Sequence, residues 1–365
     1  MGRLENTPRR GSQGHDAKQV DQGLSPVSRS RCAHQRGGVV QGIILFFLTL
    51  LFLAAAAAGI GGYLAYKEVH RPGPLAAETV VLLEPGMGVN QIGAILAEND
   101  IIRHAELFNA AVRWRQAGAT LKAGEYRFAP GVTVLEVIDI LVDGSSILHF
   151  LTFAEGRTTK QIVAAIEADG VLTGEITMEP REGALLPETY GFSRGETRDA
   201  LIKRMASAQK AVLDELWESR ASDLPLANRR EAVILASIVE KETGIASERD
   251  RVAAVFINRL RKRMRLESDP TIIYGLTGGE PLGRGLRQSE LRGETPYNTY
   301  VIRGLPPTPI CNPGRASIEA VLNPAQTDDL FFVADGTGGH AFARTLRDHN
   351  ANVRRWRQIE RQNRR

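Results

Sequence analysis

The sequence predicts an α+β protein with one N-terminal transmembrane helix, a small strand-turn-helix module and a larger mixed domain. Three observations support this prediction. Residues 43–66 contain no charge, short strand-turn-helix patterns recur between residues 82 and 172, and longer amphipathic helices with a Gly-rich hairpin follow beyond residue 174. A chain of 365 residues is long enough for two modest domains and a tail.

The apolar run is the first predicted element. It exceeds the roughly 20 residues that a helix needs to span a bilayer, so we expect a transmembrane helix over residues 41–67. The Ala-rich end of the run leaves cleavage as a signal peptide open. Basic residues outnumber acidic ones in residues 1–40, so the positive-inside rule predicts a cytoplasmic N-terminus, with the bulk of the chain on the other side of the membrane. We expect residues 1–40 to be a disordered basic tail, because they offer little to bury.

Charge and cysteine content limit the possible partners. A net charge of +4 is too small to support binding in a nucleic-acid groove, and membrane lipid is the nearer anion for the basic tail. Cys32 and Cys311 fall on opposite sides of the predicted membrane, so they cannot form a disulfide. The sequence contains neither a zinc-type Cys/His spacing nor an HExxH motif, so we expect no metal and no cofactor.

Three strand-turn-helix patterns follow the apolar run. They cover residues 82–102, 127–144 and 151–172, with turns at Gly86, Gly131 and Gly156. Apolar residues in the helical parts recur at helical spacing, for example Ile162 and Ile166. We therefore expect a small α+β module over residues 78–150, between the membrane and a larger domain over residues 151–353.

The larger domain contains the most informative segment, ASIVEKETG at residues 236–244. Leu235, Ile238 and Glu242 fall on one face of a helix, whereas Glu240 lies about 200° around the axis, near Ser237. A carboxyl on an apolar stripe resists ionisation and can donate a proton near neutral pH. A structural ion pair with Lys241, Arg249 or Arg251 is the alternative, and periodicity alone does not decide between them. Gly244 offers a stop for the helix.

A second helix is expected directly afterwards. Ser247 and Asp250 resemble a capping box, and an apolar stripe runs from Val252 to Leu260. Residues 268–312 read as a loop-rich stretch, and the glycines of residues 331–343 favour a hairpin. Beyond it we expect a solvated Arg-rich helix from Asn350, with residues 354–365 as a basic tail.

Polar residues suited to sugar binding gather after the second helix. Tyrosine rings pack on sugar faces and amides bond to hydroxyl or acetamido groups. Polar side chains in Pro-rich loops also form hydrogen bonds to the backbone of the loop itself. For any one of these residues taken alone, that structural role is the preferred interpretation. The candidates are Asp269, Thr295, Tyr297, Asn298 and Tyr300.

Several of these segments together resemble the YceG-like family of endolytic murein transglycosylases. They are ASIVEKET, ERDRVAAVFINRL, SDPTIIYG, TPYNTY, GLPP and FVADGTGGH, in that order, and the likeness covers roughly residues 80–353. The first two strand-turn-helix units, with KAGEYRF between them, resemble a LysM-like module. The resemblance implies peptidoglycan glycan strands as substrate and cell-wall synthases as possible partners. It also implies a single-pass protein of the bacterial inner membrane with its catalytic domain in the periplasm.

The resemblance also implies roles for single residues. The second glutamate of the family's EKE is catalytic, which here is Glu242. GALLPETYGF at residues 183–192 matches a family stretch and suggests that Glu188 and Tyr190 line the cleft, together with Ser237 and Glu240 from the helix. His340 in the matched hairpin is a weaker cleft candidate.

The implied reaction cleaves the β-1,4 bond between N-acetylmuramic acid and N-acetylglucosamine in nascent strands and leaves a 1,6-anhydro end. One carboxyl group suffices, because the nucleophile is the sugar's own C6 hydroxyl, whereas ordinary hydrolysis uses two carboxyls. Two other classes stay open: a non-catalytic peptidoglycan-binding scaffold and a muramidase that uses water.

Overall fold

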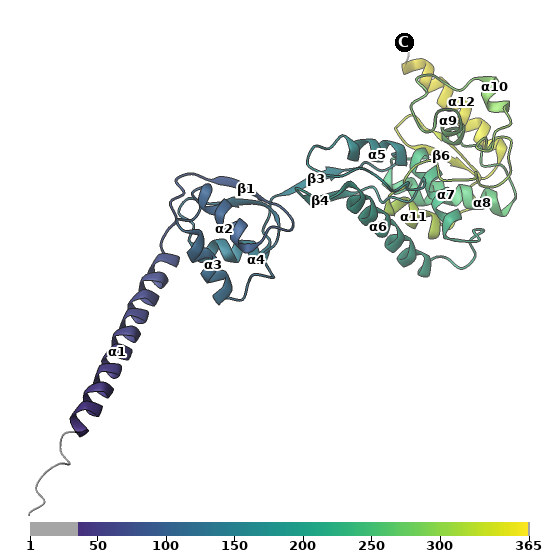
Figure 1. Cartoon of the computed structure of the whole chain (residues 1–365). Coiled ribbons are helices and arrows are strands. Elements are labelled where there is room, and N and C mark those ends of the chain that lie inside the picture. Colours follow the sequence, from purple (N-terminus) through teal and green to yellow (C-terminus); the bar gives the residue numbers. More distant parts are fainter. Residues whose placement is uncertain (1–35, 364–365) are drawn as a thin grey trace, which may run out of the picture. The chain divides into compact units, whose positions relative to one another are not determined.

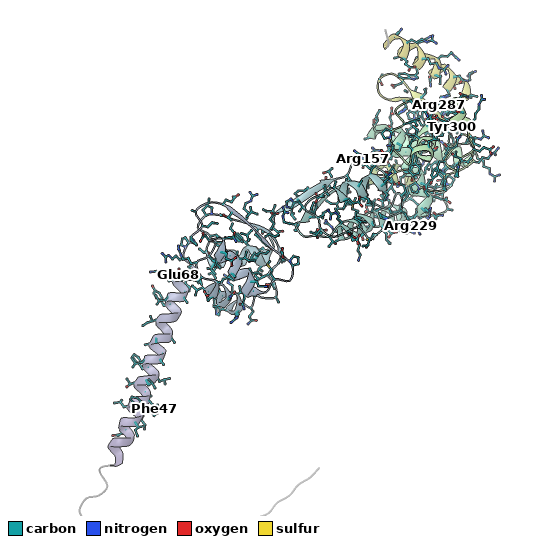
Figure 2. All side chains as sticks on the ribbon, turned by 45° about the horizontal axis from the view of Figure 1, so that its top comes forward. Phe47, Glu68, Arg157, Arg229, Arg287 and Tyr300 are labelled. Atoms are coloured by element: carbon teal, nitrogen blue, oxygen red, sulfur yellow. The ribbon has the colours of Figure 1, made fainter. Side chains whose placement is uncertain are left out.

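The computed structural model describes residues 36–363, and these divide into two units at Lys67 and Glu68 (Figure 1). The first unit contains helix α1, Arg36–Val69, which runs slightly past the division. Residues 41–69 of α1 are long and apolar enough to cross a membrane. Large apolar side chains such as Phe47 project from it without cover (Figure 2). The predicted disordered tail lies almost entirely outside the described residues.

The second unit begins with a small α+β module. Strands β1 (Thr79–Leu83) and β2 (Gly124–Phe128) pair antiparallel, with Thr79 opposite Phe128. Helices α2 (Val89–Glu98), α3 (Ala105–Trp114) and α4 (Val134–Asp143) pack with them around one core. The largest fully buried side chains of that core are Tyr126, Phe108, Phe128, Leu83 and Leu96.

All three predicted strand-turn-helix units are present. Gly86, Gly131 and Gly156 have φ angles of 90°, 70° and 76°, which disfavour a side chain. The helix of the second strand-turn-helix pattern begins with a capping box. Thr133 Oγ1 accepts from Glu136 N at 3.3 Å, and Glu136 Oε2 accepts from Thr133 N at 2.8 Å. A strand, a tight turn and a capped helix thus follow directly from the sequence.

The strand of the third strand-turn-helix pattern belongs to a second sheet. Strand β3 (Leu148–Thr152) pairs antiparallel with β4 (Thr189–Ser193), and helices α5 (Thr159–Glu167) and α6 (Arg198–Glu218) flank the pair (Figure 1). Ile166, Phe192 and Leu201 are fully buried between these elements. One face of the two strands is therefore packed.

A helical core completes the chain. Helix α7 (Arg229–Glu242) packs against α8 (Arg249–Arg261), α9 (Asp269–Thr277) and α11 (Arg315–Leu322). Strands β5 (Phe331–Ala334) and β6 (His340–Ala343) form the predicted hairpin, and α12 (Leu346–Asn363) packs against both of them. Up to Asn363, the expected C-terminal tail continues this last helix without a break.

One local expectation was wrong. A 3₁₀ turn, η1 (Ala246–Glu248), precedes α8, and no side chain caps α8, so Ser247 does not form the expected capping box. Helix α7 ends at Glu242 with an extended Thr243 as its C-cap, and Gly244, the expected stop, follows directly. The stretch expected to be loop-rich also contains α9 and the short helix α10 (Gln288–Arg292). Pro270 near the start of α9 and Gly278 in the left-handed conformation at its end are signals that identify α9.

Candidate active site

Helix α7 places Glu242 where the core meets solvent. Its residues from Ala232 to Val239 are all buried, because α8 and α11 pack on it from different sides. Asn228 caps its start and accepts from Glu231 N at 3.1 Å. Glu242 is the last helical residue, and its side chain reaches solvent only in part.

The Glu242 carboxyl favours its protonated form. Its pKa is raised from 4.5 to about 7, mainly by burial and also by the nearby charge of Asp269. A hydrogen bond from Ser268 and the nearby His340 and Arg259 lower the pKa, but burial outweighs them. A carboxyl with a pKa of about 7 holds a proton and can also release it near neutral pH.

The ion-pair alternative fails for Glu242. Lys241 Nζ donates to Gly156 O at 3.4 Å, and Arg251 Nε pairs with Asp329 at 2.7 Å. Among residues 36–363, Ser268 Oγ is the only hydrogen-bond partner of the Glu242 carboxyl, at 2.5 Å from Oε1, and no ion pair includes this carboxyl. The second carboxylate oxygen is therefore available to another molecule.

Buried threonines fix the position of Ser268. Its N–H donates to Thr299 Oγ1 at 2.9 Å, and Thr271 Oγ1 donates to its carbonyl at 2.7 Å. The hydroxyls of Thr271 and Thr299 lie 2.9 Å apart, and all three residues are buried. The start of α9 and the TPYNTY segment together hold the Ser268 hydroxyl on Glu242.

A second carboxylate, Asp269, comes near Glu242 from α9. Asp269 is exposed, and its Oδ1 accepts from the Tyr300 hydroxyl at 2.7 Å. Burial, together with Asp269, raises the pKa of Tyr300 above its ordinary value. Tyr300 is labelled in Figure 2, in the C-terminal part of the chain. Two predicted site residues thus lie beside Glu242.

His340 of the hairpin also belongs to this group. His340 is one of the groups that lower the pKa of Glu242, so the ring lies within electrostatic reach of the carboxyl. Glu248 fixes it, since Oε2 lies 2.8 Å from Nδ1 and Oε1 accepts from the His340 N–H at 3.0 Å. Phe332 packs edge-on against the ring. These contacts orient the ring from one side.

Glu240 points to a different place, as its helical phase predicts. Its Oε2 accepts from Gly314 N at 3.0 Å, at the start of α11. The exposed Glu155 carboxyl lies against Gly314 as well, because a Cβ built there would be 1.7 Å from Glu155 Oε1. Burial and the charges of Glu240 and Glu188 raise the pKa of Glu155. These glutamates form an acidic group beside the end of α7.

Other predicted residues lie inside the protein. Ser237 is fully buried, donates to Ile234 O at 2.7 Å and accepts from Ile310 N at 3.0 Å. Cys311 lies beside it, and burial raises the pKa of that thiol well above its ordinary range. Tyr190 is buried with its hydroxyl on Leu186 O at 2.9 Å. Ser237 and Tyr190 therefore use their hydroxyls within the fold.

The remaining candidates shape the TPYNTY loop. Asn298 is fully buried and donates to three carbonyls, and its Oδ1 accepts from Tyr300 N at 3.0 Å. The Tyr297 hydroxyl lies 2.7 Å from Thr308 Oγ1, and its ring packs 5.1 Å from that of Tyr274. Thr295 is partly exposed, and its carbonyl accepts from Asn298 N. Asn298 thereby orients the backbone that carries Tyr300.

Sequence reasoning missed Ser268, Thr299, Glu155 and Glu182. The first two lie inside motifs that were singled out, whereas Glu155 lies in a turn that was read only for its glycine. Glu182 is a largely buried carboxyl that accepts from Thr159 N at 2.8 Å and from the Tyr274 hydroxyl at 3.2 Å, and burial raises its pKa. Within the described part of the chain, no three His, Cys, Asp or Glu side chains are grouped to hold a metal ion.

Comparisons with known proteins agree on one family. The model of the YceG-like family matches residues 81–355. An endolytic murein transglycosylase of Bacillus subtilis (strain 168) is 31% identical over 330 residues, which cover 80% of this chain and 89% of that protein. An endolytic murein transglycosylase of Streptococcus pneumoniae (strain D39) is 27% identical over 367 residues, covering 86% of this chain and 65% of that protein.

A solved structure is also similar. It is the crystal structure of a yceG-like protein from Listeria monocytogenes, with 29% sequence identity and a TM-score of 0.46. The similarity covers 75% of this chain and 98% of that one.

Proposed function

The chain belongs to the YceG-like family, and from that premise we propose that it is a membrane-anchored endolytic transglycosylase of peptidoglycan. The relatives are endolytic murein transglycosylases, and this chain is accordingly a lytic transglycosylase. The finer parts of the proposal are the bond that is cleaved, the residue that cleaves it and the anchoring by α1.

The proposed bond is the β-1,4 link between N-acetylmuramic acid and N-acetylglucosamine. The protonated Glu242 gives its proton to the glycosidic oxygen, so the bond from that oxygen to C1 breaks. The resulting carboxylate takes the proton of the C6 hydroxyl, and O6 closes on C1 to form the 1,6-anhydro end. No water is consumed, and Glu242 ends the cycle protonated.

One observation carries this proposal. Glu242 combines a pKa of about 7 with one carboxylate oxygen that no described residue engages. A group that must act as acid and then as base in one cycle works best when its pKa lies near the working pH. Ser268 holds the other oxygen, and we assign Asp269, Tyr300 and His340 to the glycan-facing surroundings.

The cleft walls are assigned by exposure. Glu188, Glu240 and Thr295 reach solvent and are proposed to contact the glycan. Ser237, Tyr190 and Asn298 are buried, and Tyr297 packs in the core with its hydroxyl on Thr308. We propose that these four act by holding the helix and loop in place. The LysM-like module and the synthase partnership are proposed on the resemblance alone.

Hydrolysis is a second candidate function. Asp269 is an exposed carboxylate near Glu242, and paired carboxyls are what hydrolytic glycosidases use to activate water. The Tyr300 hydroxyl occupies Oδ1 of Asp269, which favours an electrostatic role for this residue over that of a base.

Product analysis separates these functions. The full chain in detergent is incubated with purified peptidoglycan, and the released fragments are identified by mass. Transglycosylation gives ends that are lighter than hydrolytic ends by one water. Reducing ends would replace the proposal by hydrolysis, and the absence of any release would leave a binding scaffold.

A further inference from the structure

One face of the β3–β4 pair is open. Side chains alternate across a strand, and Leu151, Tyr190 and Phe192 face the packed side. Leu148 and Phe150 face the other side, with 52% and 64% of their surfaces exposed. No described element covers these two apolar side chains, although the strands themselves are regular.

Phe150 is laid across the neighbouring strand. Gly191 is its direct partner in the ladder, and a Cβ built at Gly191 would lie 3.1 Å from the Phe150 ring. The ring can take this position because the glycine has no side chain. It therefore presents an exposed aromatic surface held by the backbone of β4.

Hydroxyl groups flank this ring on both sides along the ladder. Thr152 and Thr189 form the next pair, with their hydroxyl oxygens 2.9 Å apart, and both residues are exposed. Ser193 lies on the other side, 3.2 Å from the Ser146 hydroxyl. An exposed ring between hydroxyls suits a sugar, whose flat face packs on the ring while its own hydroxyls bond to the sides.

We propose that the open β3–β4 face is a binding subsite for the glycan strand, with Phe150 as its sugar-stacking platform. The inference rests on the proposed function, because it takes the same polysaccharide as ligand. It assigns to β3 and β4 a role in holding the strand away from the bond that is cleaved.

The position of the face selects this occupant. The ladder ends at Thr152 and Thr189, and the chain continues there into Glu155 and back into Glu188. Glu155 lies against Gly314, which also binds Glu240 two residues before Glu242. Phe150 is at most about 18 Å of extended chain from Glu155. A polymer that passes the acidic group can therefore reach the ring.

Binding of peptide-free glycan strands to the full chain in detergent tests the proposal. Every protein compared carries Glu242→Gln, so cleavage does not interfere. Phe150→Ala is expected to weaken binding about threefold to tenfold, and Phe150→Trp is expected to restore it. Gly191→Ala, which displaces the ring, is expected to weaken binding as well. The control is Leu346→Ala, which removes an apolar side chain that is 59% exposed on α12.

Two results would overturn the subsite. One is an unchanged affinity for glycan in both Phe150→Ala and Gly191→Ala. The same variants are also tested on vesicles of phosphatidylglycerol and phosphatidylethanolamine, and the other result is a loss confined to these vesicles, which would assign the face to a membrane. Failure of the proposed function is seen in a separate experiment, on the chain with Glu242 intact, as release of products without anhydro ends. In that case Phe150→Ala would still weaken glycan binding in the Glu242→Gln background.

Discussion

Ser268 Oγ lies 2.5 Å from Glu242 Oε1, and this hydrogen bond joins the start of α9 to the end of α7. The bond stabilises the carboxylate form, whereas burial stabilises the protonated form more strongly, so the pKa is about 7. The relationship explains how one residue could serve first as acid and then as base.

The pH profile of cleavage is the first prediction. Because the proposed mechanism needs a protonated Glu242 to donate to the glycosidic oxygen, kcat/KM should fall as the pH rises through about 7. Initial rates on soluble glycan strands between pH 5 and 9 measure this limb. A rate that stays constant up to pH 9 would mean that another group donates the proton.

Two neighbours should move that limb in opposite directions. Ser268→Ala removes a bond that lowers the pKa of Glu242, so the limb should move to higher pH. Asp269→Asn removes a charge that raises this pKa, so the limb should move to lower pH. Asp328→Asn is the control, because Asp328 is an exposed residue that pairs with Arg344. A shift of the same sign in both test variants would contradict the assigned surroundings.

Glu242→Gln should stabilise the fold at neutral and alkaline pH. The ordinary pKa of Glu242 is 4.5 and its folded value is about 7, so the folded state retains a proton that the unfolded chain releases. Wild-type stability therefore falls as the pH rises from about 4.5 to about 7. The variant lacks this loss and should gain about 3 kcal/mol over that range, as an upper estimate.

Urea unfolding at pH 4.5 and pH 8 measures the difference. Glu240→Gln is the matched control, since Glu240 keeps a hydrogen bond to Gly314 N that a glutamine can also accept. An equal gain in both variants would argue that the effect is not specific to the Glu242 carboxyl.

Much of the site is visible in the sequence, because it lies on one regular helix. The phase of α7 separates Glu242 from Glu240, and the structure places their carboxyls on Ser268 and Gly314 respectively. The glycine turns of the three strand-turn-helix units are equally local features. Period and turn chemistry are sufficient where neighbours in sequence decide the structure.

The partners of Glu242 are not visible in this way. Ser268 and His340 reach it from segments 26 and 98 positions further along the chain, and only tertiary packing brings them together. The tyrosines and Asn298 of the TPYNTY motif were predicted to bind the glycan, but the Asn298 side-chain amide donates to three loop carbonyls instead. Thr299, which looks ordinary in sequence, is the residue that holds Ser268.

Thr299→Val tests that role. The substitution keeps the shape but leaves the Ser268 N–H without its buried acceptor, whereas the Thr271 hydroxyl keeps only its bond to the Ser268 carbonyl. It should destabilise the protein by about 1–3 kcal/mol and lower kcat, because Ser268 no longer holds Glu242. Thr295→Val in the same loop is the control, since Thr295 is partly exposed and outside this network. Thermal melts and initial rates of both variants would show whether the two effects occur together.

The central claim is that Glu242, and not Glu240, performs the chemistry. The most direct measurement compares anhydro-muropeptide release by the wild-type chain, Glu242→Gln and Glu240→Gln, with folding of each checked by circular dichroism. We expect Glu242→Gln to be folded and to release no anhydro products, whereas Glu240→Gln should retain activity. A folded Glu242→Gln that still releases them, with activity lost in Glu240→Gln instead, would contradict it.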